Sequence, residues 1–186
     1  MQGKIKITAL LAGMLLLNGA AMAEESFAGW LFNVNRMKEV KPVDDKQYKS
    51  ECGDCHFAYQ PGLLPEQSWQ KLLTAESLKE HFGDNAEMDN DVLQSIRAYA
   101  SGNSADKSWF KRSRKISKST AYVEAPLRIT ELHYIKRKHE EIPEKMVKGN
   151  PAVKSLSFCD KCHTQAAQGV YDDDTVSIPN YPDWGD

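Results

Sequence analysis

Four cysteines, placed in two copies of one short motif, constrain this chain of 186 residues more than any other feature. The two copies read Cys52-Gly-Asp-Cys55-His56 and Cys159-Asp-Lys-Cys162-His163. Cys-x-x-Cys-His is the attachment signature of a c-type haem. The spacing suits that chemistry because two thiols add across the vinyl groups on one edge of the porphyrin, while the adjacent histidine ligates the iron. We therefore predict two covalent haems, attached through Cys52, Cys55, Cys159 and Cys162 and ligated by His56 and His163.

Three other uses of paired cysteines remain as alternatives. Zinc ribbons also use two Cys-x-x-Cys pairs, but those pairs usually lie about 15–20 residues apart, whereas about a hundred residues separate Cys55 from Cys159. A thiol-redox motif would need a thioredoxin-like βαβ pattern, which the sequence does not suggest. Two small disulfide loops are the third alternative.

The first 23 residues have the pattern of a secretory signal peptide. Lys4 and Lys6 precede an uncharged, mostly apolar run, and Ala21-Met22-Ala23 forms a small-x-small cleavage site. This pattern predicts export to the periplasm and cleavage after Ala23, with an uncleaved anchor as the alternative. No later run approaches the length of a membrane span, so we expect none after cleavage.

Composition narrows the class of protein further. Hydrophobic residues make up 41% of the chain and charged residues 27%, with a formal net charge of −2. These values are typical of a globular protein. They argue against a nucleic-acid binder, which would usually carry a strong basic excess.

The sixth position of each iron needs a further ligand, and three histidines remain. His139 lies within residues 131–142, which we expect to form a helix between a cap at Thr130 and a stop at Pro143. Apolar residues share the helical face of His139, which favours an iron ligand over a core histidine bonded to the backbone. His133 falls on another face, so we expect it at the surface.

His81 is the second candidate distal ligand. It lies near the end of an expected helix over residues 75–83, where Gly83 is a natural stop. A histidine placed there to interact with the helix dipole is the alternative reading. The methionines at 37, 88 and 146 are rival ligands, although Met88 heads an apolar helical face typical of core packing.

Spacing suggests how the histidines pair. His81 follows His56, and His139 precedes His163, by about 25 residues in each case. We therefore pair His56 with His81 and His163 with His139, while crossed pairing stays open.

The chain resembles the periplasmic dihaem cytochrome c (DHC) family, and the resemblance extends over about residues 42–180. The matching segments are Ser50–Tyr59, Pro61–Pro65, Ser68-Trp69, His81–Ala86, Ala125–Glu131, His139–Ile142 and Cys159–His163. The resemblance implies that both haems are bis-histidine, with His81 and His139 as distal ligands. It also implies an electron carrier that reduces a small oxygen-binding monohaem cytochrome c, often alongside a membrane cytochrome b.

For the fold we expect a mainly α, loop-rich protein in which two small helical c-type haem lobes pack together and the haems form much of the core. The expected parts are an N-terminal haem lobe similar to class I cytochrome c over residues 24–101, a linker or basic loop over 102–120, and a C-terminal haem lobe with an acidic tail over 121–186. The basic stretch 111–118 is typical of a solvated loop. A docking patch for an acidic redox partner is the alternative.

Function follows from the coordination of the iron. An iron with six protein ligands has no open site for a substrate, so we predict one-electron transfer and no enzymatic activity. Two histidines hold the potential below that of a His/Met haem. The alternatives are a haem enzyme that reduces peroxide, nitrite or oxygen after a distal ligand dissociates, and a gas-sensing haem module.

Overall fold

The computed structural model describes residues 38–121, 123–124 and 126–184, and the part from Lys38 onward forms one compact unit. The predicted signal peptide, its cleavage site and Met37 lie outside the described residues. None of the helices in the described ranges is long and apolar enough to cross a membrane.

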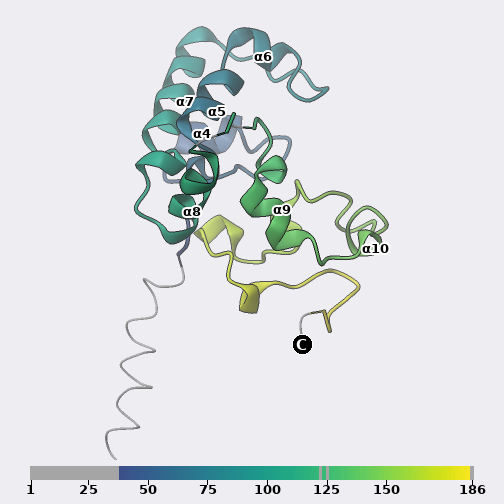
Figure 1. Ribbon diagram of the computed structural model, residues 1–186. Helices are drawn as coiled ribbons and strands as arrows, with labels where there is room; N and C mark the ends of the chain where they lie inside the picture. The colour runs from purple at the N-terminus through teal and green to yellow at the C-terminus, as the bar shows by residue number, and fades with distance from the viewer. Residues whose placement is uncertain (1–37, 122, 125, 185–186) are drawn as a thin grey trace, which may run out of the picture. The chain divides into compact units, whose positions relative to one another are not determined.

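The described part of the chain is mainly helical and loop-rich, as expected from the sequence (Figure 1). Its α-helices are α4 (Lys46–Glu51), α5 (Glu66–Leu72), α6 (Ala75–Lys79), α7 (Asn90–Gly102), α8 (Lys111–Thr120), α9 (His133–His139) and α10 (Glu144–Val147). Short 3-10 turns lie between and after them: η1 (Pro61–Leu63), η2 (Ala105–Lys107), η3 (Ile129–Glu131), η4 (Cys159–Lys161), η5 (Ala166–Gln168) and η6 (Asp173–Thr175). Extended pairing within these ranges is limited to isolated bridges.

Helix α7, the longest in the described part of the chain, explains how the N-terminal elements pack. Leu93, Ile96 and Ala100 are spaced three and four residues apart, so they share one face, and all three are buried. This face packs against α5, where Trp69 is also buried. The indole nitrogen of Trp69 donates a hydrogen bond to the carbonyl of Pro61 at 2.8 Å, which satisfies its polar group inside the core.

Helix α8 corrects the expectation of a linker or exposed loop over residues 102–120. Residues 111–120 form a helix in which Arg112, Ser113 and Ile116 are buried. The helix packs against η1, η2 and α9, and in Figure 1 it lies below α4, α5 and α7 and above the yellow C-terminal segment. The sequence was misleading because Arg112, which composition alone classes as one more solvated charge, pairs with the buried carboxylate of Glu39.

Two helix boundaries near the expected distal ligands also differ from the sequence prediction. The segment expected as one helix over 131–142 is split into η3 and α9, so Leu132 rather than Thr130 occupies the N-cap position of α9. Helix α6 ends at Lys79, so His81 lies in the turn that follows it and not on the helix. A 3-10 turn thus replaces the first turn of the helix expected around His139, and a non-helical turn replaces the end of the helix expected around His81.

Candidate functional site

The first site brings together the histidine of the first motif and His81. At the N-cap of helix α4 the Asp45 carboxylate accepts from the backbone N–H of Tyr48 at 2.8 Å, and Cys52 is the C-cap of the same helix. His56 follows in the turn after that helix. The rings of His56 and His81 lie with centroids 6.5 Å apart and planes 25° apart. The two side chains therefore face each other across a gap wider than a direct contact.

A tight turn holds His81 in this position. The backbone N–H of His81 donates to the carbonyl of Asp84 at 2.7 Å, and the N–H of Asp84 donates back at 3.2 Å. Phe82 and Gly83 close the turn with φ angles of 58° and 108°. Glycine adopts such angles without a Cβ penalty, which explains why the chain can reverse directly after the histidine. Arg128 lies over the Phe82 ring, with its guanidinium carbon 3.8 Å from the ring centroid.

The second site brings together His163 and His139, which are the histidine of the second motif and the last residue of α9. Turn η4 runs from Cys159 to Lys161, and the N–H of His163 donates to the carbonyl of Cys159 at 2.8 Å. The rings of His139 and His163 have centroids 6.0 Å apart, but their planes are 74° apart. The two sites thus share a spacing and differ in ring orientation.

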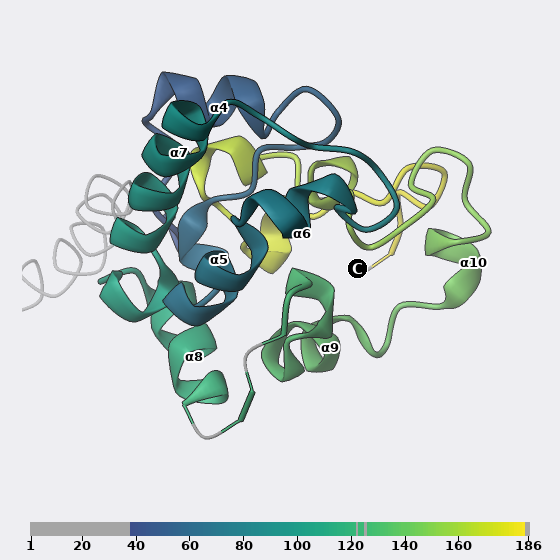
Figure 2. The same cartoon turned by 90° about the horizontal axis from the view of Figure 1, so that it is seen from above.

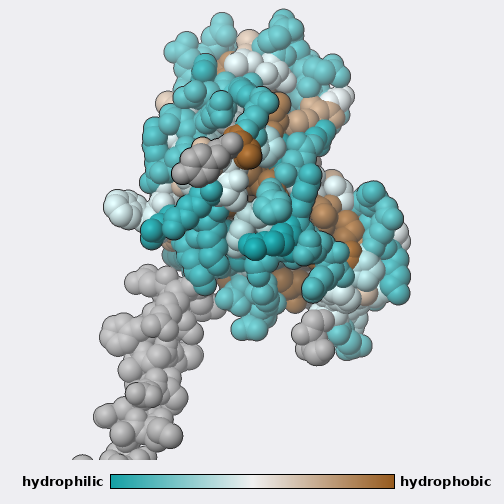
Figure 3. Space-filling view, viewed as in Figure 1, coloured by the Kyte–Doolittle hydropathy of each residue, from teal (hydrophilic) through white to brown (hydrophobic). Residues whose placement is uncertain are grey.

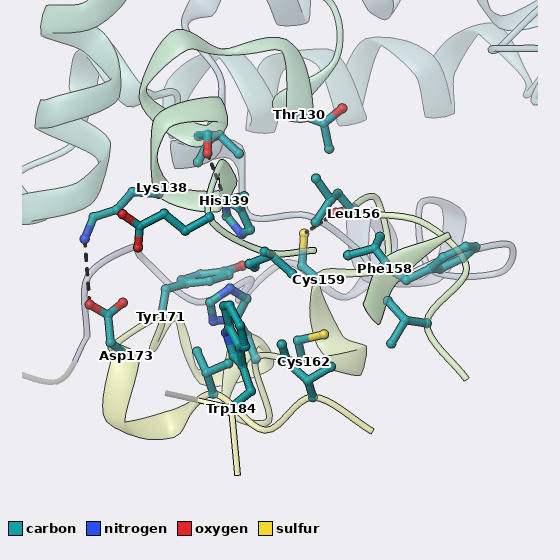
Figure 4. A pocket seen from close by; sticks show the side chains of 18 of the residues that line it. Thr130, Lys138, His139, Leu156, Phe158, Cys159, Cys162, Tyr171, Asp173 and Trp184 are labelled. Atoms are coloured by element: carbon teal, nitrogen blue, oxygen red, sulfur yellow. Dashed lines mark hydrogen bonds and ion pairs between the residues drawn. The ribbon is translucent and has the colours of Figure 1, made fainter. Parts of the chain in front are cut away.

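A cavity of about 690 Å³ opens between the two histidines of the second site. Its wall includes both histidines, Cys159 and Cys162, and Figure 4 shows these cysteines and His139 arranged around it. Binding pockets for cofactors commonly enclose about 300–1,000 Å³. The cavity therefore has the size, the thiols and the ring pair that a covalently attached macrocycle requires.

The outer ring nitrogens support a ligand role for the histidines. The Nδ1 atoms of His56 and His139 lie 2.8 Å from the carbonyl oxygens of Phe57 and Ile135, respectively. Metal-bound histidines commonly use such a bond to fix the ring. The Nδ1 atoms of His81 and His163 are buried without a hydrogen-bond partner among the described residues, so this support applies to His56 and His139.

Burial also favours the neutral form of two of these rings. Burial lowers the pKa of His163 to about 4, with smaller contributions from His139 and Arg112. The pKa of His81 is lowered first by burial and then by His56 and Arg128. A neutral imidazole is the form that binds a metal.

The four cysteines are free thiols in the described structure. Burial raises the pKa of Cys52 to about 12. Burial is also the largest cause that raises the pKa of Cys159 to about 12. Thiol-disulfide chemistry and zinc binding use the thiolate, which a lowered pKa favours. Within the described ranges no group of three or more His, Cys, Asp or Glu residues is arranged to hold a metal ion by itself.

The consecutive residues Tyr59 and Gln60 link the two sites, and sequence reasoning missed them. The Tyr59 ring lies against His56, with centroids 4.7 Å apart, and its hydroxyl donates to the carbonyl of Ser157, two residues before Cys159. Gln60 accepts from the hydroxyl of Tyr171 at 2.6 Å. The Tyr171 ring in turn lies 5.1 Å from that of His163. An aromatic residue three positions after a Cys-x-x-Cys-His histidine was the signal in the sequence.

A buried ion pair forms part of the support of the second site. Arg112 lines the cavity and donates to Glu39 through Nε at 3.1 Å and also through Nη2. Its Nη2 also donates to the carbonyl of Tyr171 at 2.8 Å, and its Nη1 donates to the hydroxyl of Tyr134 at 3.3 Å. Arg112 therefore ties helix α8 to Glu39, to Tyr134 of helix α9 and to Tyr171 in the cavity wall.

The structure also places the other ligand candidates. His133 is exposed on α9, as expected for a surface histidine. Met88 is partly buried against the core, and Met146 is buried in α10. Neither methionine is among the residues that line the cavity of the second site.

The residues of both sites fit a haem attached through cysteine and held between two histidines. Metal–nitrogen bonds to histidine are about 2.0 Å and the centre of an imidazole lies about 1.1 Å behind its nitrogen, so two rings on opposite sides of one iron have centroids roughly 6 Å apart. The observed separations are 6.5 Å and 6.0 Å.

Comparison with known proteins gives the same class. Residues 48–171 match the family model described as dihaem cytochrome c. The diheme cytochrome c of Shewanella baltica OS155 is 37% identical, with a TM-score of 0.61, over 75% of this chain and 96% of that chain. The diheme cytochrome c of Rhodobacter sphaeroides is 35% identical, with a TM-score of 0.62, over 71% of this chain and 100% of that chain. No curated protein sequence is matched. The chain therefore belongs to the dihaem cytochrome c family, a family of electron-transfer proteins, and carries two covalently bound c-type haems.

Proposed function

We propose that this protein is a periplasmic, low-potential one-electron carrier with two bis-histidine haems and no enzymatic activity of its own. In this proposal His56 and His81 ligate the first iron, and His163 and His139 ligate the second. The observation that carries it is the pair of ring separations, 6.5 Å and 6.0 Å, which match two imidazoles on opposite sides of one metal.

When bound, haem iron supplies one-electron oxidation and reduction. His56 with His81, and His163 with His139, would hold the two irons, and a full set of protein ligands would leave no position for a substrate. His56 and His139 are fixed by their Nδ1 contacts to backbone carbonyls, and burial keeps His81 and His163 neutral and available as ligands. Two imidazoles, rather than an imidazole and a thioether, hold the potential low.

The link through Tyr59 and Gln60 supports transfer between the two sites within one molecule. These two residues connect the wall of the first site to Ser157 and Tyr171 at the second, through one ring contact and two hydrogen bonds. These contacts give electrons a short path through bonds and hydrogen bonds from one pair of histidines to the other. We propose that electrons pass from one haem to the other and leave to a small oxygen-binding monohaem cytochrome, with a membrane cytochrome b as a further partner.

The test is an absorption spectrum of the protein matured with c-type haem assembly, recorded oxidised, reduced, and reduced with CO. We expect two covalent haems per chain and no change on adding CO. His139→Ala should create a CO-binding haem because it vacates an axial position. His133→Ala on the same helix is the matched control and should not, because His133 is exposed and faces no other histidine.

Clear CO binding by the unaltered protein would contradict the proposal, since one axial ligand would then dissociate on reduction. That result would favour an enzyme or a gas sensor. A normal haem content in the Cys52→Ala or Cys159→Ala variant would contradict the attachment sites.

A further inference from the structure

Helices α8 and α9 concentrate positive charge on a chain that is slightly negative overall. Together they carry eight of the chain's 24 Lys and Arg residues and no Asp or Glu, while the formal net charge of the chain is −2. Arg112 is buried, and the other seven are exposed: Lys111, Arg114, Lys115, Lys118, Lys136, Arg137 and Lys138. Within the described ranges only Lys138 of these seven has an ion-pair partner, Asp173 at 3.7 Å.

The two helices lie side by side, so their charges form one surface. Helix α8 packs against α9, and both views place them on the same side of the molecule (Figures 1 and 2). The face turned to the viewer in Figure 1 is largely covered by hydrophilic side chains (Figure 3). We call the exposed residues of the two helices, together with Trp109, the α8–α9 face.

Trp109 is the second observation that marks this face. It lies two residues before α8, and 91% of its surface is exposed. Tryptophan is usually largely buried, and it is enriched among the residues that contribute most to binding at protein interfaces. An exposed indole beside a row of basic side chains has the composition of a docking surface, not merely of a solvated helix.

The α8–α9 face borders the second site. His139 is the last residue of α9, and the two residues before it, Arg137 and Lys138, line the cavity. Arg112 lines the same cavity from α8. A protein that docks on this face therefore comes to lie beside the second site rather than the first.

Charge at the first site is of the opposite sign. Residues 76–91, which include His81, carry one exposed lysine and six exposed carboxylates: Glu76, Glu80, Asp84, Glu87, Asp89 and Asp91. An acidic partner would be repelled there and attracted to the α8–α9 face. Opposite charge speeds encounter and fixes orientation.

We propose that the α8–α9 face is the docking surface for an acidic redox protein, which accepts one electron from the second site and is thereby reduced by one electron while this protein is oxidised by one. This inference rests on the proposed function. An anionic membrane is the less suitable occupant, because Ile116 and Ile135 are buried and Trp109 is the one exposed large apolar side chain of the α8–α9 face as defined above.

The test is the rate at which the reduced holoprotein reduces an acidic rubredoxin, followed by stopped flow at low and high ionic strength. The variant is Lys115→Glu with Lys118→Glu, two exposed residues that are not part of the cavity wall. The matched control is Lys46→Glu with Lys49→Glu on helix α4, which has the same spacing, the same charge change and two side chains that are likewise exposed. In Figure 2, α4 lies on the side of the molecule away from α8 and α9.

We expect the α8 variant to lose about tenfold in second-order rate constant at low salt, and the α4 control to change by less than about twofold. The difference should disappear as salt screens the charges. Trp109→Ser should weaken binding of the same rubredoxin about tenfold at either salt concentration. Equal losses in the two lysine variants, or no loss in either, would overturn the proposal.

Two controls separate the possible failures. Reduction of uncharged benzoquinone at an unchanged rate shows that each variant still transfers electrons; if the unaltered protein fails this step, the proposed function itself fails. Binding of the unaltered protein, but not the α8 variant, to phosphatidylglycerol vesicles, together with an unchanged rubredoxin rate, would make the α8–α9 face a membrane contact and overturn the proposal.

Discussion

The buried pair of Arg112 and Glu39 gives a stability prediction that the structure makes quantitative. Both side chains retain only 10% exposure, and Arg112 donates to Glu39 through two nitrogens. Glu39→Gln keeps the size and one acceptor oxygen of the side chain but removes its charge. The guanidinium would then stay buried without a charged partner, with the glutamine oxygen, the Tyr171 carbonyl and the Tyr134 hydroxyl as its acceptors.

The expected cost is several kcal/mol. Two unit charges about 4 Å apart attract by about 4 kcal/mol at an effective dielectric constant of about 20. Removing one partner of a buried pair typically destabilises a protein by about 3–5 kcal/mol, because the other charge is left uncompensated. Since glutamine still accepts one hydrogen bond, we expect a loss near the lower end, about 3 kcal/mol.

Urea unfolding of the holoprotein, followed by circular dichroism, measures this change in the free energy of unfolding. Glu66→Gln is the matched control: Glu66 accepts from Lys107 at 3.0 Å on the surface and should cost less than about 1 kcal/mol. Replacing both buried partners, Glu39→Leu with Arg112→Met, should cost less than Glu39→Gln alone. The reasoning is refuted if Glu39→Gln is no more destabilising than Glu66→Gln.

Three further predictions follow from the two sites and the loop near them. His81→Met or His139→Met should each raise the potential of one haem, because methionine raises it; a redox titration without a shift would remove that residue from the ligand set. The ring planes differ by 25° at the first site and 74° at the second. Near-parallel imidazoles separate two iron d orbitals more than steeply crossed ones, so the oxidised protein should give two distinct low-spin electron paramagnetic resonance signals, with greater anisotropy from the second; one shared signal would contradict this. Gly169→Ala should cost about 1–3 kcal/mol in urea unfolding, because Gly169 has a φ of 77° and its new Cβ would collide with the carbonyl oxygen of Val40. Gly102→Ala, with open space around it, is the control and should be near neutral.

Local chemistry explains what could be read from the chain. Attachment of a c-type haem needs two thiols and a histidine within five consecutive residues, so the motifs at Cys52 and Cys159 are visible without any knowledge of the fold. The mainly α class was also predictable, since helical spacing of apolar residues is local. His81 and His139 could be proposed as partners, although the turns around them were mistaken for helix.

The tertiary structure decided what depends on contacts between distant residues. Sequence left crossed pairing open, and the fold brings His56 opposite His81 and His139 opposite His163. It also places the consecutive residues Tyr59 and Gln60 between two sites about a hundred residues apart in the chain.

Helix α8 shows the physical reason most directly. By composition, the sequence from Lys111 to Thr120 favours a solvated loop, because charge alone does not reveal whether a side chain has a buried partner. Glu39 supplies that partner for Arg112, from 73 positions away in the sequence. The haem-attachment motifs can therefore be recognised from the sequence alone. The burial of a charge and the pairing of distant ligands depend on how the whole chain packs.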